Sequence, residues 1–546
     1  MDCGTTSRWL TLVKEGGELI EDPITFEVLK NALISSAREM SQALRKTAFS
    51  PNIKERRDCS CAVFDSDGNL VAQSKDIPVH LGAMPLSVKA CIENLGDDMA
   101  EGTMALVNDP YSGGSHLPDL TLVAPLYQKG ERVAFTANRA HHADIGGISP
   151  GSMPGLSVSI HEEGALIKPR IVVKEGQLVR DSVSDLLEST RTPDERLGDL
   201  SAQVAANNVG MKRIIQVADN NGWETLLRTF GELQQYSAQM MSSALRKFEG
   251  KYGEFTDYME SDGAGTWDIP ISVSVEIHDG RASVDFAGTS DQVQGNINCP
   301  LASSLSAVYY VFIVLFGKDV PTNSGCWSVI DVDIKEGSLL YPTYPSPVSA
   351  GNVETSQRIV DTTLGALAEI VPGLVPAASQ GTMNNLTIGG IDPRTNGPFS
   401  FYETIGGGAG ASRGEHGASG IHTHMTNTLN TPIESLESEY PLRIRCYSIK
   451  RNTGGVGEWK GGDGIIREIE ILANGSTISI QSERRSLQPW GLEGGSNGTS
   501  GSNTIFFEGK EHPLQSKSTV MAPKGTVIRI ETPGGGGYGS PPQDKE

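Results

Sequence analysis

The spacing of hydrophobic residues changes between helical and strand periods along the chain. In residues 23–50 the apolar positions recur at helical spacing, and Asp22 followed by Pro23 is typical of a helix start. Residues 58–73 instead show two short apolar runs about Asp67-Gly68, which predicts two strands and a tight turn. Strand-like segments then continue to about residue 175. We therefore expect helix and sheet to mix in the N-terminal part.

A second helical pattern follows, and it begins with a capping signal. Thr192 and Glu195 stand in the positions of a capping box, so we expect their side chains to close the first turn of a helix. The later elements expected from periodicity are further helices to about residue 248, strands over 253–287, helices at 300–317 and 355–371, and strands beyond 462.

These elements predict an α+β protein of several domains, with mixed β-sheet domains, an inserted helical block and a β-rich C-terminal region. At 546 residues the chain is longer than one hydrophobic core usually supports, which agrees with several domains. The expected divisions are a polar leader (1–22), an N-terminal α+β domain (23–190), a helical block (191–250), a central α+β domain with glycine-rich loops (251–460), and a β-rich C-terminal region with a tail (461–546).

Charge and composition restrict the partners. The formal net charge is −21 and there is no basic run, which argues against nucleic acid or an anionic membrane as partner. The longest uncharged run, 301–317, is short for a membrane span and contains serines, so we expect a buried core helix. Residues 1–18 lack a signal-peptide pattern, and the seven cysteines lack zinc-finger spacing. We therefore expect a cytoplasmic protein with reduced thiols.

Glycine is the unusual component of the composition. There are 63 glycines, well above the usual share of about 7%, and they come in bursts such as GGGAGASRGEHG and GGVGEWKGGDG. The bursts interleave with Trp, His, Arg and Glu, unlike flexible linkers. We expect ordered loops in which the backbone turns sharply or approaches another segment closely. The final TPGGGGYGSPPQDKE, in contrast, is expected to be an exposed tail.

The most informative segment is SHLPDLTLVAPLYQKGERVAFTANRAHHADIGG, residues 115–147. It carries an H-x-x-D before one strand-like run and an H-H-x-D after the next. If 120–127 and 132–140 are antiparallel strands, the hairpin brings His116 and Asp119 back beside the second motif. The convergence of imidazoles and carboxylates therefore follows from local folding alone.

The register of this hairpin decides which residue faces Asp119. With Tyr127 opposite Arg132, Asp119 faces Ala140; a slip of one residue pairs it with His141, and a slip of two with His142. Two imidazoles and one carboxylate would supply three metal ligands and leave positions open for water or substrate, as in catalytic metal sites. The alternative is structural, with the histidines capping a turn and satisfying hydrogen bonds in the core.

Several long motifs resemble one family. NDPYSGGSHLPD, RAHHADIGG, PVHLGAMPLSV, SGIHTHMTNTLNTPIE, SERRSLQPWGLEGG and TPGGGGYG occur in order and are similar to the hydantoinase B family over residues 22–540. The family includes the B subunit of ATP-dependent N-methylhydantoinases, the C-terminal half of 5-oxoprolinase, a caprolactam-hydrolysing subunit and the metal-binding subunit of acetone carboxylase.

The resemblance implies a ligand set and a partner. It places a divalent metal, Zn or Mn, on His116, Asp119 and His141, and it implies an A-type subunit with an actin-like ATPase fold in a hetero-oligomer. The chain has no G-x-x-x-x-G-K-[ST] motif, so ATP is expected on that partner. A metal-activated water would then hydrolyse a cyclic amide that the partner has activated. His142 and Asp144 are candidates for proton transfer or for orienting a ligand imidazole.

Other polar clusters carry weaker expectations. His422 and His424 alternate as on a strand and could hold a second metal, although substrate or subunit contact is the stronger interpretation. Glu483 to Arg485 could grip phosphate or form a solvated turn with an internal ion pair. Asp109 could reach the metal or form an Asx turn. Cys59 and Cys61 are expected to pack in a strand.

Three functions remain open from the sequence. The first is a metal-dependent subunit of an ATP-dependent cyclic amide hydrolase acting on a hydantoin, lactam or oxoproline. The second is the metal-bearing subunit of a ketone carboxylase, because the same ligands could stabilise an enolate. The third is a scaffold subunit with structural histidines. The sequence does not name the substrate or choose the metal.

Overall fold

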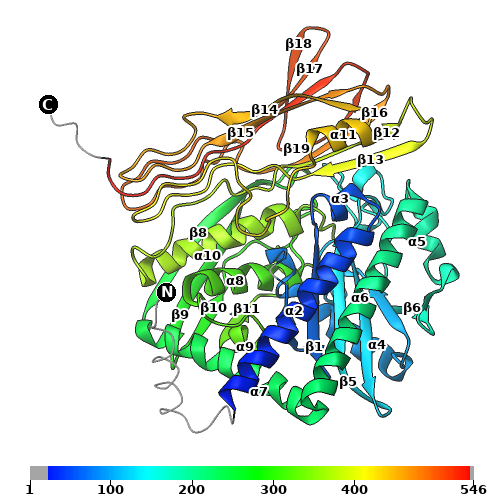
Figure 1. Ribbon diagram of the computed structural model, residues 1–546. Helices are drawn as coiled ribbons and strands as arrows, with labels where there is room; N and C mark the ends of the chain where they lie inside the picture. Colours follow the sequence, from blue (N-terminus) through cyan, green and yellow to red (C-terminus); the bar gives the residue numbers. More distant parts are fainter. Residues whose placement is uncertain (1–21, 75, 542–546) are drawn as a thin grey trace.

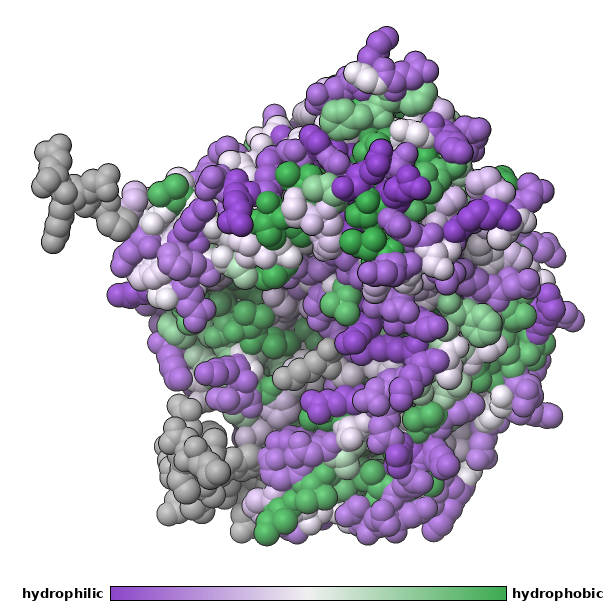
Figure 2. All heavy atoms as spheres, turned by 45° about the horizontal axis from the view of Figure 1, so that its top comes forward, coloured by the Kyte–Doolittle hydropathy of each residue, from purple (hydrophilic) through white to green (hydrophobic). Residues whose placement is uncertain are grey.

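The structure is a computed structural model that describes residues 22–74 and 76–541. Residues 1–21 of the expected leader and residues 542–546 of the expected tail lie outside this range. Within it, helices and strands combine in four sheets, which confirms the α+β multi-domain prediction (Figure 1). No described helix is long and apolar enough to cross a membrane. On the face shown in Figure 2, hydrophilic side chains predominate and hydrophobic ones occur in small groups.

The N-terminal sheet is covered by helices on both faces, because successive residues of a strand point to opposite sides. Val63 packs with apolar residues of α2 (Pro23–Thr47), α6 (Pro193–Asn221) and α7 (Trp223–Leu245). Its neighbour Phe64 packs with those of α4 (Ala83–Leu95). The strand order is β2-β1-β5-β4-β3-β6-β7. The strands are β1 (Cys59–Asp65), β2 (Leu70–Gln73), β3 (Met104–Val107), β4 (Asp119–Gln128), β5 (Glu131–His141), β6 (Arg170–Lys174) and β7 (Gln177–Leu178).

The helices of this part begin differently from one another. The Asp22 carboxylate accepts hydrogen bonds from the backbone N–H groups of Ile24 and Thr25, as predicted. Thr192 precedes α6, but its hydroxyl makes no capping bond with the described residues, so the predicted capping box is wrong. Glu195 forms an ion pair with Arg196 instead, because the buried guanidinium needs a carboxylate partner. The helices are α2 (Pro23–Thr47), α3 (Pro51–Lys54), α4 (Ala83–Leu95), α5 (Ser184–Ser189), α6 (Pro193–Asn221) and α7 (Trp223–Leu245).

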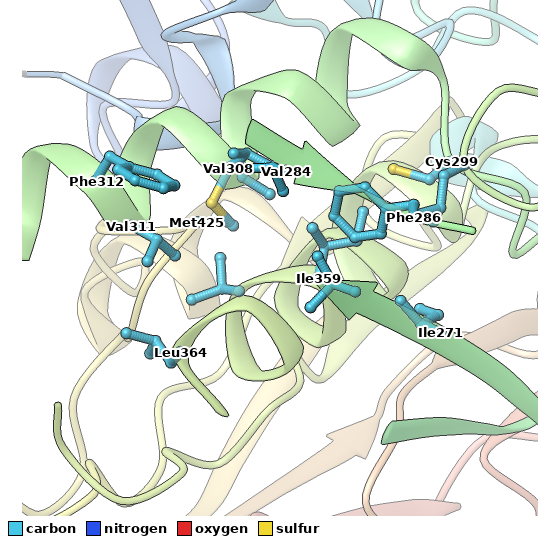
Figure 3. Packing of buried hydrophobic residues seen from close by; sticks show 14 of the residues in the cluster. Ile271, Val284, Phe286, Cys299, Val308, Val311, Phe312, Ile359, Leu364 and Met425 are labelled. Atoms are coloured by element: carbon cyan, nitrogen blue, oxygen red, sulfur yellow. The ribbon is translucent and has the colours of Figure 1, made fainter. Parts of the chain in front are cut away.

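The central part holds the largest core. Its strands alternate buried and exposed residues, and the expected helices at 300–317 and 355–371 are present as α8 and α10. Figure 3 shows Val308 of α8, Ile359 of α10 and Val284 of β10 in the same apolar cluster. The elements are β8 (Tyr252–Ser261), β9 (Trp267–His278), β10 (Arg281–Asp285), β11 (Ile330–Asp333), α8 (Leu301–Phe316), α9 (Ser324–Trp327) and α10 (Ser356–Ile370).

The two C-terminal sheets cross the division expected at residue 460. They have the orders β13-β12-β16-β19 and β14-β15-β20-β17-β18, so strands before that residue pair with strands after it. Their apolar faces form one core. The elements are β12 (Asn385–Ile391), β13 (Pro398–Glu403), α11 (Ile433–Glu439), β14 (Leu442–Lys450), β15 (Gly464–Ile471), β16 (Ser476–Gln481), β17 (Ser502–Phe507), β18 (Lys510–Leu514), β19 (Lys517–Ala522) and β20 (Val527–Glu531).

The glycine bursts form an ordered layer of hydrogen-bonded backbone, seen at the left of Figure 1 as segments running side by side. Gly462 donates to Ala409 at 2.8 Å and accepts from Gly535 at 2.9 Å. A Cβ added to Gly535 would lie 2.0 Å from the Ala409 oxygen, so this approach excludes any side chain. Residues 532–539 are buried in the layer. The expectation of an exposed tail is therefore wrong for these residues, because their backbone groups find partners in neighbouring loops.

Candidate metal centre

The β4–β5 hairpin brings the predicted ligands together. Tyr127 pairs with Arg132, but a bulge next to Leu126 shifts the pairing by one residue toward the open end. Asp119 therefore faces His141 and not Ala140. The structure selects the second of the three registers that the sequence left open.

Three donor atoms of this hairpin converge on one point. The Nε2 atom of His116 lies 3.2 Å from Nδ1 of His141 and 3.2 Å from Oδ1 of Asp119. The third side of the triangle, from His141 Nδ1 to Asp119 Oδ1, is 3.3 Å. Ligands about 2.1 Å from one metal ion and about 100° apart around it are separated by about 3.2 Å. The three side chains therefore fit a single divalent ion.

Burial and neighbouring side chains together set the protonation of these groups. Burial alone would raise the pKa of Asp119, but the neighbouring His116 and His80 hold it well below its ordinary value, so the carboxylate is ionised. Burial lowers the pKa of His141 despite the carboxylates of Asp119 and Asp58 beside it. Its imidazole is neutral at neutral pH and keeps a lone pair. A carboxylate and neutral imidazoles are the forms that bind metal.

The donors face a small cavity built from distant parts of the chain. It has a volume of about 20 Å³, which is room for about one water molecule. Tyr402 of β13 stacks on the His141 ring, with centroids 4.5 Å apart. The cavity is lined by Asp58, Ile77, Val79, His80, His116, Asp119, His141, Asn352, Val353, Met383, Tyr402, Thr404, Met425, Thr426 and Thr428.

The other two predicted residues lie outside this cavity. His142 points the opposite way from His141, and its Nε2 atom is 3.0 Å from Oε1 of Gln203 on α6. The Asp144 carboxylate accepts backbone hydrogen bonds from Gly146 and Gly151 and pairs with Arg191 at 3.0 Å. The structure therefore brings together His116, Asp119 and His141, while His142 and Asp144 fix the segment that follows the hairpin.

The residues of the other predicted clusters do not line this cavity. Asp109 accepts the N–H of Tyr111 at 2.9 Å, which is an Asx turn, and it does not line the cavity. Burial raises the pKa of Cys59 to about 12, as expected for a packing thiol. His422 and His424 do not lie on a strand, contrary to expectation, because His424 has a left-handed backbone with φ of 54°.

The solvated turn expected at 483–485 is wrong. Arg484 is buried, and its Nη2 atom lies 2.7 Å from carboxylate oxygens of both Asp257 and Asp361. Glu483 is buried as well, with Lys517 at 2.5 Å and Arg358 at 3.3 Å. These charges can be buried because each has partners of opposite charge. The partners lie on β8, α10 and β19, far away in sequence.

Sequence reasoning missed several residues of the cavity wall. His80 belongs to the quoted PVHLGAMPLSV motif, but its distance from the hairpin gave no ligand spacing. Asp58 ends the short loop before β1, and its backbone oxygen accepts the N–H of His141 at 3.1 Å. Tyr402 comes from the C-terminal sheets. Only the pairing of β1 with β5 and the packing of β13 place these side chains at the site.

Together, the fold and the site define a multi-domain α+β protein with a buried group of two histidines and one aspartate that could hold a divalent ion. The chain belongs to the Hydantoinase B/oxoprolinase family, whose model matches residues 22–541.

Two relatives and two solved structures are similar to this chain. An uncharacterized protein of Methanocaldococcus jannaschii is 39% identical, with 95% of this chain and 91% of that protein covered. A 5-oxoprolinase of Dictyostelium discoideum is 40% identical, and the match covers 95% of this chain but 40% of that enzyme. The ATP-dependent caprolactamase of Pseudomonas jessenii has a TM-score of 0.88 at 28% identity, covering 96% of this chain and 92% of that chain. A nucleotide-free acetone carboxylase shares the fold, with a TM-score of 0.89 at 18% identity and coverage of 97% and 77%.

Proposed function

We propose that this chain is the metal-dependent hydrolytic component of an ATP-dependent cyclic amide hydrolase of the hydantoinase, oxoprolinase or lactamase type. The observation that carries the proposal is the triangle of His116, Asp119 and His141 donor atoms, with sides of 3.2 to 3.3 Å, in a buried cavity. The names of the relatives supply the reaction class, since 5-oxoprolinase and caprolactamase both open ring amides. The ATP dependence in this proposal follows the caprolactamase, which is named as ATP-dependent.

The side chains have separate roles in this proposal. His116, Asp119 and His141 hold Zn or Mn, and an ion held there supplies Lewis acidity that lowers the pKa of water and polarises an oxygen. Asp58 is a carboxylate in the cavity wall and is placed to accept a proton or to add a ligand. Tyr402 and the threonines of the cavity wall orient the ring of the cyclic amide substrate. His142 and Asp144 lie outside the cavity, where they fix the segment that follows the hairpin, and they transfer no proton.

ATP chemistry belongs to a partner in this scheme. The chain spans 40% of the 5-oxoprolinase it matches, so the rest of that enzyme carries additional parts. We propose an actin-like ATPase as a separate A-type subunit or as a fused neighbour. It activates the amide oxygen, and this chain hydrolyses the activated ring.

The cavity must open before a ring can enter. At about 20 Å³ it excludes any cyclic amide. Two bonds join the segments that cover it, from Val79 N–H to Met425 O at 3.3 Å and from Asn427 Nδ2 to Asp76 O at 3.0 Å. Separation of these segments would admit the substrate, and their return would exclude bulk water.

The test uses a co-expressed complex with the A-type partner. Wild-type protein should bind about one Zn or Mn per chain and open a hydantoin, lactam or 5-oxoproline only with ATP. His116→Ala should lose both metal and activity, while His161→Ala, at an exposed histidine outside the cavity, should keep both. Bicarbonate-dependent consumption of a ketone would favour the carboxylase alternative. Absence of metal in the wild-type complex would favour the scaffold and reject the proposal.

A further inference from the structure

A third histidine lies at the candidate metal centre but outside the ligand triangle. His80 ends the short turn Pro78–His80 and is 2% exposed. Its Nδ1 atom lies 2.9 Å from the Ser60 hydroxyl, and its Nε2 atom lies 3.4 Å from Oδ2 of Asp119. The imidazole therefore bridges β1 to the carboxylate of the triangle.

The hydrogen bonds around His80 indicate which nitrogen carries the proton. A carboxylate that binds a metal ion carries no proton and can only accept hydrogen bonds, so a favourable contact with Oδ2 of Asp119 requires a proton on Nε2 of His80. Ser60 Oγ accepts the Ile77 N–H at 3.2 Å and still has its own proton to donate to Nδ1. The side-chain contacts from Ser60 through His80 to Asp119 then form a continuous series in which each donor faces an acceptor.

The two oxygens of Asp119 have different surroundings as a result. Oδ2 accepts from Ser115 Oγ at 2.5 Å and faces His80. Oδ1 accepts no hydrogen bond from the described residues and is the oxygen that faces His116 and His141. Holding one oxygen of a carboxylate fixes the direction of the other. The carboxylate thus presents a single oxygen to the ion.

We propose that His80 is a positioning residue that turns Asp119 so that Oδ1 alone binds the metal. The inference rests on the proposed metal centre. Residues that orient metal ligands typically change metal affinity 10- to 100-fold when they are replaced. His80 acts through Asp119, and the ion is held by the hairpin residues.

Two amide substitutions separate the two ring nitrogens. The side-chain NH₂ of His80→Gln reaches the position of Nε2 and can still donate to Asp119, whereas that of His80→Asn reaches only the position of Nδ1. Zn²⁺ affinity is measured by chelator competition on the purified full chain, and the visible spectrum is recorded with Co²⁺ as probe. His80→Asn should weaken Zn²⁺ binding about 10- to 100-fold and alter the Co²⁺ spectrum, and His80→Gln should stay within about 3-fold of wild type. His161→Asn, at an exposed histidine that also contacts a hydroxyl, is the matched control.

The outcomes distinguish this inference from the proposed function. If wild type binds no metal, the metal centre itself fails. If wild type binds Zn²⁺ and His80→Asn binds it equally with an unchanged Co²⁺ spectrum, the positioning role is refuted. Equal loss in His80→Asn and His80→Gln also refutes it, because His80 would then be a ligand. If His80→Asn does not fold, Ser60→Ala replaces it, and wild-type affinity in that variant refutes the inference.

Discussion

Substitution of Gly535 by alanine tests the glycine layer that supports the C-terminal sheets. A Cβ at this position would lie 2.0 Å from the Ala409 oxygen and 2.7 Å from the Gly410 nitrogen, both backbone atoms that cannot rotate away. The segments of Gly535 and Ala409 must separate by about 1.4 Å to bring this Cβ to an ordinary contact distance of 3.4 Å. Two hydrogen bonds then break, from Gly535 to Gly462 at 2.9 Å and from Gly455 to Gly535 at 2.8 Å.

The expected loss follows from these contacts. Overpacking costs about 1–3 kcal/mol, and the two hydrogen bonds contribute about 0.5–1.5 kcal/mol each, so Gly535→Ala should destabilise by about 2–6 kcal/mol. Gly231 of α7 is the matched control, because a Cβ there meets nothing within 4 Å. Gly231→Ala should stabilise by about 0.4–1 kcal/mol through lower unfolded-state entropy.

Urea unfolding followed by circular dichroism measures the stability of both variants. Amide hydrogen exchange over residues 532–539 shows whether the effect of Gly535→Ala lies in the glycine layer. Faster exchange in this segment is expected for Gly535→Ala only. A Gly535→Ala variant with the unfolding midpoint and exchange rates of wild type would refute the close-packed layer.

Three further predictions concern the site and its surroundings. Asp119→Asn should weaken Zn²⁺ binding by at least about 100-fold, which is about 2.7 kcal/mol, and unchanged affinity by chelator competition would remove Asp119 from the ligand set. His142→Ala should bind Zn²⁺ within about 3-fold of wild type. It should lose about 1–3 kcal/mol of unfolding free energy, because the side-chain oxygen of Gln203 loses its partner. A large loss of metal affinity would contradict the placement of His142 outside the cavity. Burial raises the pKa of Glu354 to about 7 from an ordinary value of 4.5. Between pH 4.5 and pH 7 the folded state therefore holds a proton that the unfolded state has lost, and the wild type loses stability as pH rises through this range. Glu354→Gln should therefore gain stability relative to wild type between pH 5 and pH 8 in urea titrations, and a constant difference would contradict the raised pKa.

The hairpin shows how far local sequence reaches. Adjacent antiparallel strands with a short turn bring His116 and Asp119 to the second histidine motif without any tertiary information. The register was beyond the sequence, because a bulge at Leu126 shifts the pairing and depends on how the strands sit in the sheet. The left-handed backbone at His424 likewise removed a strand that alternation alone had suggested.

Buried charges were the main failure of sequence reasoning. Glu483 and Arg484 look like a surface turn, because charged residues are rarely buried unless they are paired. Their partners on β8, α10 and β19 lie between 34 and 227 residues away. The sequence near Glu483 and Arg484 gives no indication of such pairs.

The sequence by itself determined the mixed fold, the main helices, the hairpin and the convergence of its two histidine motifs, because these depend on period, turn chemistry and neighbouring strands. Only the tertiary structure decided that Asp119 faces His141, that His142 turns away, and that Asp58, His80 and Tyr402 complete the cavity wall. The physical reason is that side-chain pattern specifies which face of an element is buried. Which remote face it meets is chosen by packing the whole chain.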